Sequence, residues 1–216
     1  MTPNRKVFVY DRRARIYESL MNSHRYGVTL HDFIILLQLE LNSQKPSILD
    51  LGCGTGMTTQ AIKEKFPGAI VTGFDYSQEM LKIYEERNPG AQIINGDYNN
   101  ELSFKSFSSL EHVSLDSNKF DLVISATSLS EYGIPQKIFP FVNRILKKDG
   151  LFLIIGIKDN IIGYISNLIW DFKRLGKRDL IKQFQKSNFS HIQNHKISWR
   201  FFPMNLMKFA ISGRKS

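Results

Sequence analysis

The chain has 216 residues, of which 42% are hydrophobic and 23% are charged, ordinary values for a globular protein. This length predicts one domain with one core. The single cysteine, Cys53, excludes an intramolecular disulfide framework and a zinc site built from cysteines. No apolar stretch reaches the ~20 residues that a membrane-spanning helix needs, and no apolar run typical of a signal peptide is found. We therefore expect a cytoplasmic protein, in keeping with a reducing compartment.

The net charge of +9 is concentrated in the second part of the chain. Residues 1–136 hold 13 Lys and Arg against 16 Asp and Glu, whereas residues 137–216 hold 16 against 4. A basic half can attract nucleic acid, an anionic membrane surface or an anionic substrate. A lysine-rich solvated surface explains the same charge, and the sequence leaves these alternatives open.

The first elements expected in chain order lead to a glycine-rich turn. Residues 33–41 have the spacing of an amphipathic helix that packs on a sheet. A buried strand follows at 48–51, and glycine then occupies every second position, as Gly52, Gly54 and Gly56. Such a turn lets the backbone come close to a ligand.

The turn has the form D-x-G-x-G-x-G, with Asp50 two residues ahead of the first glycine. A dinucleotide-binding turn, G-x-G-x-x-G, would need glycine at position 57, where the chain has Met57. The carboxylate would repel a pyrophosphate but suits a cationic ligand. A nucleoside that carries an ammonium and a sulfonium group fits this description.

A second strand is expected to end in another acid. A helix over 58–66 is stopped by a Pro-Gly pair, and a strand over 69–75 follows. Asp75 lies 19 residues beyond Gly56, the place from which an acid at a strand tip accepts ribose hydroxyls. Asp75 could instead cap the next helix, but Ser77 suits that role better.

The next helix is expected over 78–87 and the third strand over 92–96. Asp97 and Tyr98 come directly after this strand. The sequence leaves open whether Asp97 is a functional acid or a turn residue. The polar stretch 98–119 is expected to be a surface excursion.

A near-continuous apolar run over 120–125 predicts a fourth strand, of the kind found in buried parallel sheets. A helix over 137–148, a turn at 148–150 and a fifth strand over 151–157 follow. Ligands of open α/β sheets bind beyond the carboxyl ends of the strands, so we expect the chemistry near residues 126–132.

The remaining chain is expected to form a helical segment, 161–190, and two strands, 191–202 and 206–212. An apolar stripe in the helical segment is explained by core packing or by a lid for a greasy substrate. His191 and His195 are four residues apart, but their surroundings indicate a strand, and we predict no metal site.

Strands and helices alternate through five strands, which implies a parallel, doubly wound α/β sheet. The motifs together resemble those of class I S-adenosylmethionine-dependent methyltransferases. D-x-G-x-G-x-G is that family's first motif, Gly73 to Leu81 is close to its second, and Lys148 and Asp149 replace the proline and a glycine of a later turn. The resemblance covers about 160 residues from Ile48 onward. It implies a Rossmann-like seven-stranded sheet, the last strand antiparallel, with helices on both faces.

The resemblance implies S-adenosylmethionine as cofactor and S-adenosylhomocysteine as product. In the family, the acid at Asp75 binds the ribose, and the acid at Asp97 accepts a hydrogen bond from the adenine amino group. The residues expected to contact the cofactor are Tyr17, Asp50, Gly52, Cys53, Gly54, Gly56, Asp75, Tyr76, Met80, Asp97, Tyr98 and Ser125.

The segment from Tyr10 to Glu18 is similar to the Tyr-Asp-x-x-Ala-x-x-Tyr-Asp opening of quinone and phospholipid methyltransferases, with Glu18 in place of Asp. The similarity implies that this helix lies over the cofactor and that the hydroxyl of Tyr17, or else of Tyr10, reaches the cofactor carboxylate. His24, Arg25 and Tyr26 would end the same helix. We expect one methyltransferase domain, made of a helical cap (1–45), a cofactor-binding core (46–160), a helical substrate-side segment (161–190) and final strands (191–216).

The expected reaction is in-line methyl transfer to a small-molecule or lipid-like acceptor. Candidate catalytic groups are Glu131, Tyr132 and His24, each of which could equally be a loop or surface residue. One alternative is an RNA or protein methyltransferase that docks through the basic half. The Asp/Asn-Pro-Pro-aromatic motif of amino-methylating nucleic-acid enzymes is absent after the fourth strand, which argues against that branch alone. A non-catalytic cofactor-binding subunit is the other alternative.

Overall fold

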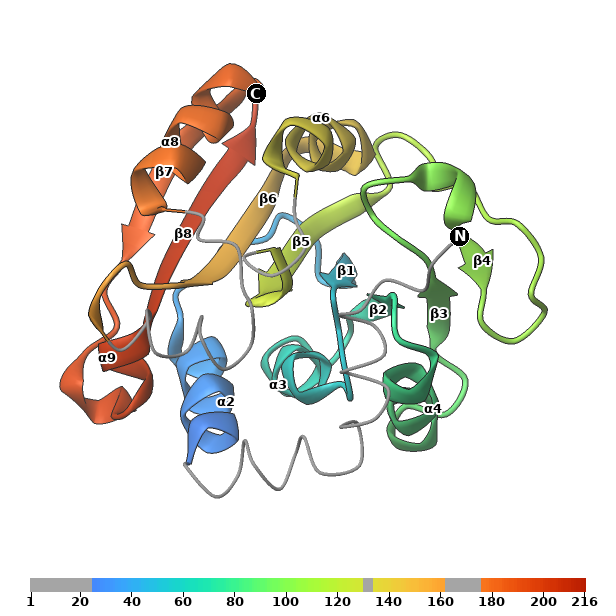
Figure 1. Ribbon diagram of the computed structural model, residues 1–216, viewed down its shortest axis with the longest axis horizontal. Helices are drawn as coiled ribbons and strands as arrows, with labels where there is room; N and C mark the ends of the chain where they lie inside the picture. Colours follow the sequence, from blue (N-terminus) through green and yellow to red (C-terminus); the bar gives the residue numbers. More distant parts are fainter. Residues whose placement is uncertain (1–24, 130–133, 162–175) are drawn as a thin grey trace.

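The fold is built around one mixed sheet (Figure 1), in a computed structural model that describes residues 25–129, 134–161 and 176–216. Within these residues the sheet has eight strands in the order β4-β3-β2-β1-β5-β6-β8-β7. The strands are β1 (Ser47–Leu51), β2 (Ile70–Asp75), β3 (Gln92–Asn95), β4 (Lys105–Ser106), β5 (Phe120–Ala126), β6 (Leu146–Ile157), β7 (Phe189–His195) and β8 (Lys208–Lys215). The helices are α2 (Tyr26–Leu36), α3 (Met57–Lys65), α4 (Gln78–Arg87), α6 (Pro135–Ile145), α8 (Lys177–Lys186) and α9 (Met204–Met207), with short 3-10 helices η1 (Glu101–Ser103) and η2 (Trp199–Phe201).

The strand directions confirm the expected doubly wound sheet. β1 pairs in parallel with both β2 and β5, β2 with β3, and β5 with β6. β8 runs antiparallel between β6 and β7, as the resemblance implies for the last strand. The expectation of seven strands misses β4, a two-residue strand antiparallel to β3 at the sheet edge, inside the polar stretch after Tyr98.

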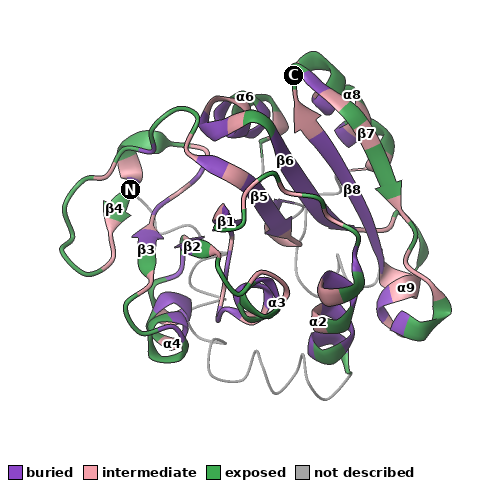
Figure 2. Ribbon diagram, turned by 180° about the vertical axis from the view of Figure 1, so that it is seen from behind, coloured by how far each residue is buried: buried purple, intermediate pink, exposed green. Residues whose placement is uncertain are grey.

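Helices cover both faces of the sheet (Figure 1), with α2, α3 and α4 on one side and α6 and α8 on the other. The apolar side chains of successive strand positions alternate between these two layers. Leu49 and Val123 face the α6 and α8 layer, while Ile48 and Leu122 face the α2 and α3 layer. Figure 2 shows that the long strands β6 and β8 are buried over most of their length.

The N-terminal helix differs from the expectation of a helix over 33–41. α2 begins at Tyr26, directly after Arg25 in a left-handed conformation (φ 56°), and ends at Leu36. Tyr26 therefore starts a new helix and does not end an earlier one. The apolar residues beyond the helix, Leu37, Leu39 and Leu41, still pack on the core. They do so at every second position of a non-helical chain, which the helical spacing alone does not reveal.

Boundaries after β5 also need correction. α6 ends at Ile145, three residues before the expected end, because Leu146 already pairs with Phe120. The expected turn at 148–150 lies inside β6 as a register shift, with Asp149 in the left-handed region (φ 60°).

The two final strands are shifted from their expected positions. The strand expected over 191–202 ends at His195, and η2 occupies 199–201. The strand expected over 206–212 starts at Lys208, because Leu206 and Met207 belong to α9. This strand continues to Lys215, beyond its expected end at residue 212, because Arg214 pairs with Leu151 of β6. The polarity of its last residues alone indicates a surface tail and not a strand.

No helix in the described part of the chain is long and apolar enough to cross a membrane.

The α8 layer rests on a cluster of phenylalanine rings. Phe184 is fully buried, and its ring centroid lies 4.9 Å from that of Phe139 and 5.6 Å from that of Phe152. A Cβ on Gly213 would lie 2.7 Å from Cδ1 of Phe184, so the missing side chain leaves the space that the ring fills.

We predict that Phe184→Ala lowers the free energy of unfolding by about 3–5 kcal/mol, because the ring leaves a cavity that the sheet cannot close. Gln185→Ala, on the exposed side of the same helix, should change it by less than ~0.5 kcal/mol. Urea unfolding of both variants measures the difference. Equal effects would mean that α8 does not anchor through this ring.

Candidate functional site

The glycine turn after β1 adopts a conformation that other residues avoid. Gly52, Gly54 and Gly56 have φ of 79°, 53° and 91°, all in the left-handed region. The turn is tied to the neighbouring strand, because the amides of Gly52 and Cys53 donate to the Phe74 carbonyl at 2.7 and 3.0 Å. Gly56 then caps α3.

Two of these glycines differ in what surrounds them. A Cβ on Gly52 would lie 2.0 Å from Oγ of Ser128, so the turn packs directly against the residues that follow β5. A Cβ on Gly54 would meet no atom of the described residues within 4 Å. The turn is therefore closed on one side and open on the other, which leaves room for a ligand beside Gly54.

Asp50 is a fully buried acid directly beneath this turn. Its Oδ2 accepts a hydrogen bond from the Thr59 hydroxyl at 2.7 Å, while Oδ1 has no hydrogen-bond partner among the described residues. Burial raises the pKa of Asp50 to about 7; the Thr59 bond opposes this rise and the negative charge of Asp75 adds to it. A buried acid with an unsatisfied oxygen is suited to a cationic or hydrogen-bond-donating ligand.

Asp75 stands at the tip of β2 and faces the glycine turn. Its Oδ2 accepts from the Gly54 amide and its Oδ1 from the Ser77 amide, both at 2.9 Å. Ser77 caps α4, as expected, by accepting from the Met80 amide at 3.2 Å. Tyr76 is 40% exposed beside this acid, whereas Met80 is buried.

Asp97 follows β3 and shapes a turn. Its Oδ1 accepts from both the backbone and the side-chain amide of Asn99, at 2.9 and 2.8 Å, while its own amide donates to Ser103 at 2.8 Å. Asp97 thus acts as a turn residue, and only its Oδ1 accepts the two hydrogen bonds from Asn99. Tyr98 is buried in the core, and its hydroxyl donates to the Ser128 carbonyl at 2.9 Å.

The end of β5 joins this group through two serines. The hydroxyls of Ser125 and Ser128 lie 2.9 Å apart, and Ser128 donates to the Leu51 carbonyl at 2.7 Å. Ser125 itself is fully buried and supports Ser128. Ser128 was not among the expected site residues; it is the residue that brings the end of β5 to the end of β1, at the point where the strand order reverses.

Cys53, within the glycine turn, is buried. Burial and the charges of Asp75 and Asp50 raise the pKa of the Cys53 thiol, which keeps the reactive thiolate scarce. Four expected site residues, Tyr17, His24, Glu131 and Tyr132, lie outside the described residues, as does Tyr10.

A second polar cluster lies at the same edge of the sheet, formed by Tyr26, Thr127 and Lys208. Sequence patterns offer no signal for it, because the three residues are separated by about a hundred and then eighty positions along the chain. Among the described residues, no group of three or more His, Cys, Asp and Glu could hold a metal ion.

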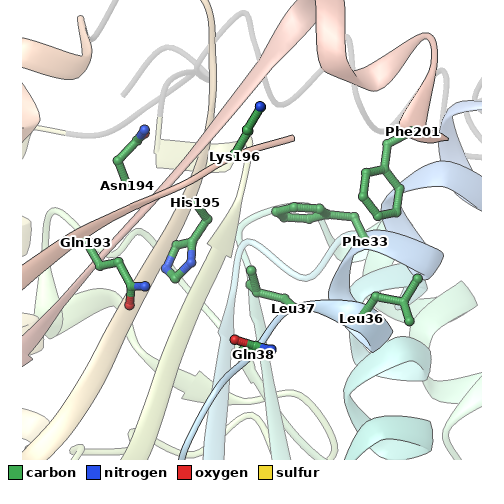
Figure 3. A pocket seen from close by; sticks show the side chains of 9 residues that line it. All are labelled: Phe33, Leu36, Leu37, Gln38, Gln193, Asn194, His195, Lys196 and Phe201. Carbon is green, nitrogen blue, oxygen red and sulfur yellow. The ribbon is translucent and has the colours of Figure 1, made fainter. Parts of the chain in front are cut away.

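A cavity of about 220 Å³ lies elsewhere, between the end of α2 and β7 (Figure 3). It is lined by Phe33, Leu36, Leu37, Gln38, Gln193, Asn194, His195, Lys196 and Phe201. His195 is held there by a 2.8 Å hydrogen bond between its Nε2 and the Ser212 hydroxyl, and burial lowers its pKa. None of the expected cofactor residues that the structure describes is among those that line this cavity.

Comparison with known proteins gives a family for the chain. The sequence profile described as "Methyltransferase domain" matches residues 42–208. A demethylmenaquinone methyltransferase of Thermotoga maritima is 29% identical over 156 residues, covering 71% of this chain and 62% of that protein. A malonyl-[acyl-carrier protein] O-methyltransferase of Halalkalibacterium halodurans is 25% identical, covering 67% of this chain and 51% of that protein. The chain thus spans roughly half to three fifths of the length of these relatives.

A solved structure of a SAM-dependent methyltransferase from Thermotoga maritima superposes with a TM-score of 0.72, at 18% identity, and covers 98% of this chain and 100% of that one. This similarity establishes the fold.

We predict that Asp50→Asn stabilises the unliganded protein at pH 8 by on the order of a few kcal/mol and has little effect near pH 4. The folded state holds the Asp50 proton up to about pH 7, whereas the unfolded chain releases it near 3.8. The free energy of unfolding of the unaltered protein should therefore fall as pH rises from about 4 to about 7.

Urea unfolding at several pH values measures this difference between the two proteins. Asp116→Asn, at an exposed acid, is the control and should show no such pH-dependent gain. A gain for Asp50→Asn that does not change with pH would contradict the raised pKa.

Proposed function

The chain belongs to the methyltransferase-domain family, and from that premise we propose that it transfers a methyl group from S-adenosylmethionine to a small-molecule or lipid-like acceptor. The observation that carries the proposal is the open glycine turn, which has the buried Asp50 beneath it and Asp75 facing it. This arrangement combines a close backbone approach with two acids, which a cationic nucleoside requires.

The residues present fit this cofactor. We propose that Asp50 offers its unsatisfied oxygen to the cationic amino-acid part of the cofactor, directly or through water. Asp75 would bind the ribose, and Asp97 the adenine amino group through its second oxygen. The other proposed contacts come from the turn and its neighbours: Tyr17, Gly52, Cys53, Gly54, Gly56, Tyr76, Met80, Tyr98 and Ser125.

When bound, S-adenosylmethionine supplies a methyl group that its sulfonium already activates. The protein's task is then to hold the acceptor in line with that methyl and to exclude water. Glu131, Tyr132 and His24 remain our candidates for a general base, which a hydroxyl or carbon acceptor would need and an amine need not.

The names of two similar proteins support a small or carrier-bound acceptor. One similar protein is named for demethylmenaquinone and another for a malonyl group on acyl-carrier protein. We therefore favour a quinone-like or acyl-type acceptor over RNA or protein.

The basic part of the chain also argues against a nucleic-acid docking face. Several of its cations are used inside the protein: Lys147 pairs with Asp121 at 2.8 Å, and the guanidinium of Arg214 donates to the carbonyls of Asp149 and Glu40. Lys215 donates to the Leu146 carbonyl. Part of the positive charge thus has partners within the fold, which weakens the case for a dedicated nucleic-acid docking face.

We further propose that residues 1–45 cap the cofactor, that residues 161–190 border the acceptor, and that the enzyme is cytoplasmic. Tyr26, at the start of α2, supports the first of these points, because its hydroxyl lies 3.4 Å from that of Thr127, just beyond β5.

We predict that Asp75→Ala weakens the binding of S-adenosylmethionine and S-adenosylhomocysteine about tenfold or more, because charged hydrogen bonds to the ribose are lost. Calorimetric titration measures both affinities. Glu79→Ala removes a nearby exposed acid that pairs with Lys82 and should leave them unchanged. Absence of binding to the unaltered, folded protein would overturn the proposed function.

A pair of glycine variants separates the cofactor site from the fold. Gly54 and Gly90 both have positive φ, and a Cβ on either would meet no atom within 4 Å in the part of the chain that the structure describes. Alanine should cost each position a similar ~1–2 kcal/mol of backbone strain. We predict that only Gly54→Ala weakens cofactor binding, because its methyl group occupies the open side of the turn; equal binding by both variants would place the cofactor elsewhere.

A further inference from the structure

Lys208, the first residue of β8, carries a buried ammonium group. Only 7% of its surface is exposed. Its ammonium donates to the Thr127 hydroxyl at 2.9 Å and lies 5.2 Å from the centre of the Tyr26 ring. Among the described residues no carboxylate pairs with it. An ammonium held this way pays a desolvation cost that a neutral hydroxyl and an aromatic ring compensate only in part.

The ammonium lies at the functional edge of the sheet. Lys208 is opposite Ile157, at the carboxyl end of β6, and Thr127 directly follows β5. The next residue, Ser128, contacts Gly52 of the glycine turn and donates to Leu51. The Lys208 ammonium is thus hydrogen-bonded to Thr127, and the next residue, Ser128, packs against the glycine turn.

The backbone of Thr127 is strained at the position where its hydroxyl contacts Lys208. Its φ of 82° is an outlier for a β-branched residue. Its amide is fixed by a 2.7 Å bond to the Ile155 carbonyl, and its hydroxyl lies between Lys208 and the Tyr26 hydroxyl, 3.4 Å away. Strain of this kind persists where surrounding contacts hold a functional geometry.

We propose that Lys208, with the hydroxyls of Thr127 and Tyr26, binds a carboxylate group of the methyl acceptor. One ammonium balances the single negative charge of a carboxylate, and the two hydroxyls supply further donors to its oxygens. The acceptor would be anchored through this carboxylate beyond the end of β5, next to Ser128, which packs against the glycine turn. The inference rests on the proposed function and narrows its acceptor to carboxylic acids.

Matched pairs of small probes test the site. Benzoate with benzamide, and hexanoate with hexanamide, differ in charge and little in shape. Calorimetric titration of the full chain, with and without saturating S-adenosylhomocysteine, should show the acids binding and the amides binding about tenfold or more weakly.

Variants identify the residue responsible. Lys208→Met should abolish the preference for acids, Lys208→Arg should keep part of it, and Tyr26→Phe should reduce it a few-fold. Lys158→Met is the control. Lys158 directly follows β6, but its ammonium donates to the Asn205 carbonyl and not to Thr127, so this variant should keep the full preference for acids.

The outcomes separate the two proposals. Unaltered protein that binds S-adenosylhomocysteine but binds acids and amides equally contradicts the carboxylate site alone. Failure to bind S-adenosylhomocysteine contradicts the proposed function. A Lys208→Met variant that loses thermal stability but keeps the preference for acids would make Lys208 a structural residue. If Lys208→Met does not fold, Lys208→Gln takes its place, and the proposal is tested by whether that variant loses the preference for acids that the unaltered protein shows.

Discussion

The contact between Gly52 and Ser128 is the constraint on which the site depends. Because residue 52 has no side chain, the Ser128 hydroxyl can reach the Leu51 carbonyl and join the end of β1 to the end of β5. These two strands are where the sheet order reverses. The same approach turns the chain after β1 so that Gly54 meets the Asp75 carboxylate. One missing side chain thus sets the positions of both halves of the site.

Asp50 and Lys208, a buried acid and a buried cation at this edge, are held in the same way. The carboxyl group of Asp50 accepts from the hydroxyl of Thr59, and the ammonium of Lys208 donates to the hydroxyl of Thr127. In each case a threonine, not an opposite charge, is the partner among the described residues. A hydroxyl fixes the direction of the group without neutralising it. The edge therefore keeps two unmet charge preferences, for a cation near β1 and for an anion near β8.

Local patterns predicted the parts of the fold that local physics determines. α4 runs from Gln78 to Arg87 as expected, because a serine cap and a Pro-Gly stop bound an apolar stripe. The position of Asp75 at the tip of β2 was predicted from the strand pattern and from its distance along the chain to the glycine turn. The expectations failed where long-range pairing decides: the ladder with β6 extends β8 through Arg214. The Lys208 cluster was beyond prediction for the same reason, since only the folded sheet brings its members together.

The position of β8 has a consequence for how the chain folds. β8 lies between β6 and β7, although both precede it in the sequence. Until residues 208–215 are available, β7 has no strand to pair with and β6 presents an open edge. An incompletely synthesised chain would therefore expose a long apolar strand, the kind of edge that pairs with other chains. Because β8 fills the place between β6 and β7, this part of the native sheet forms last, and the chain is most prone to aggregate before β8 is synthesised.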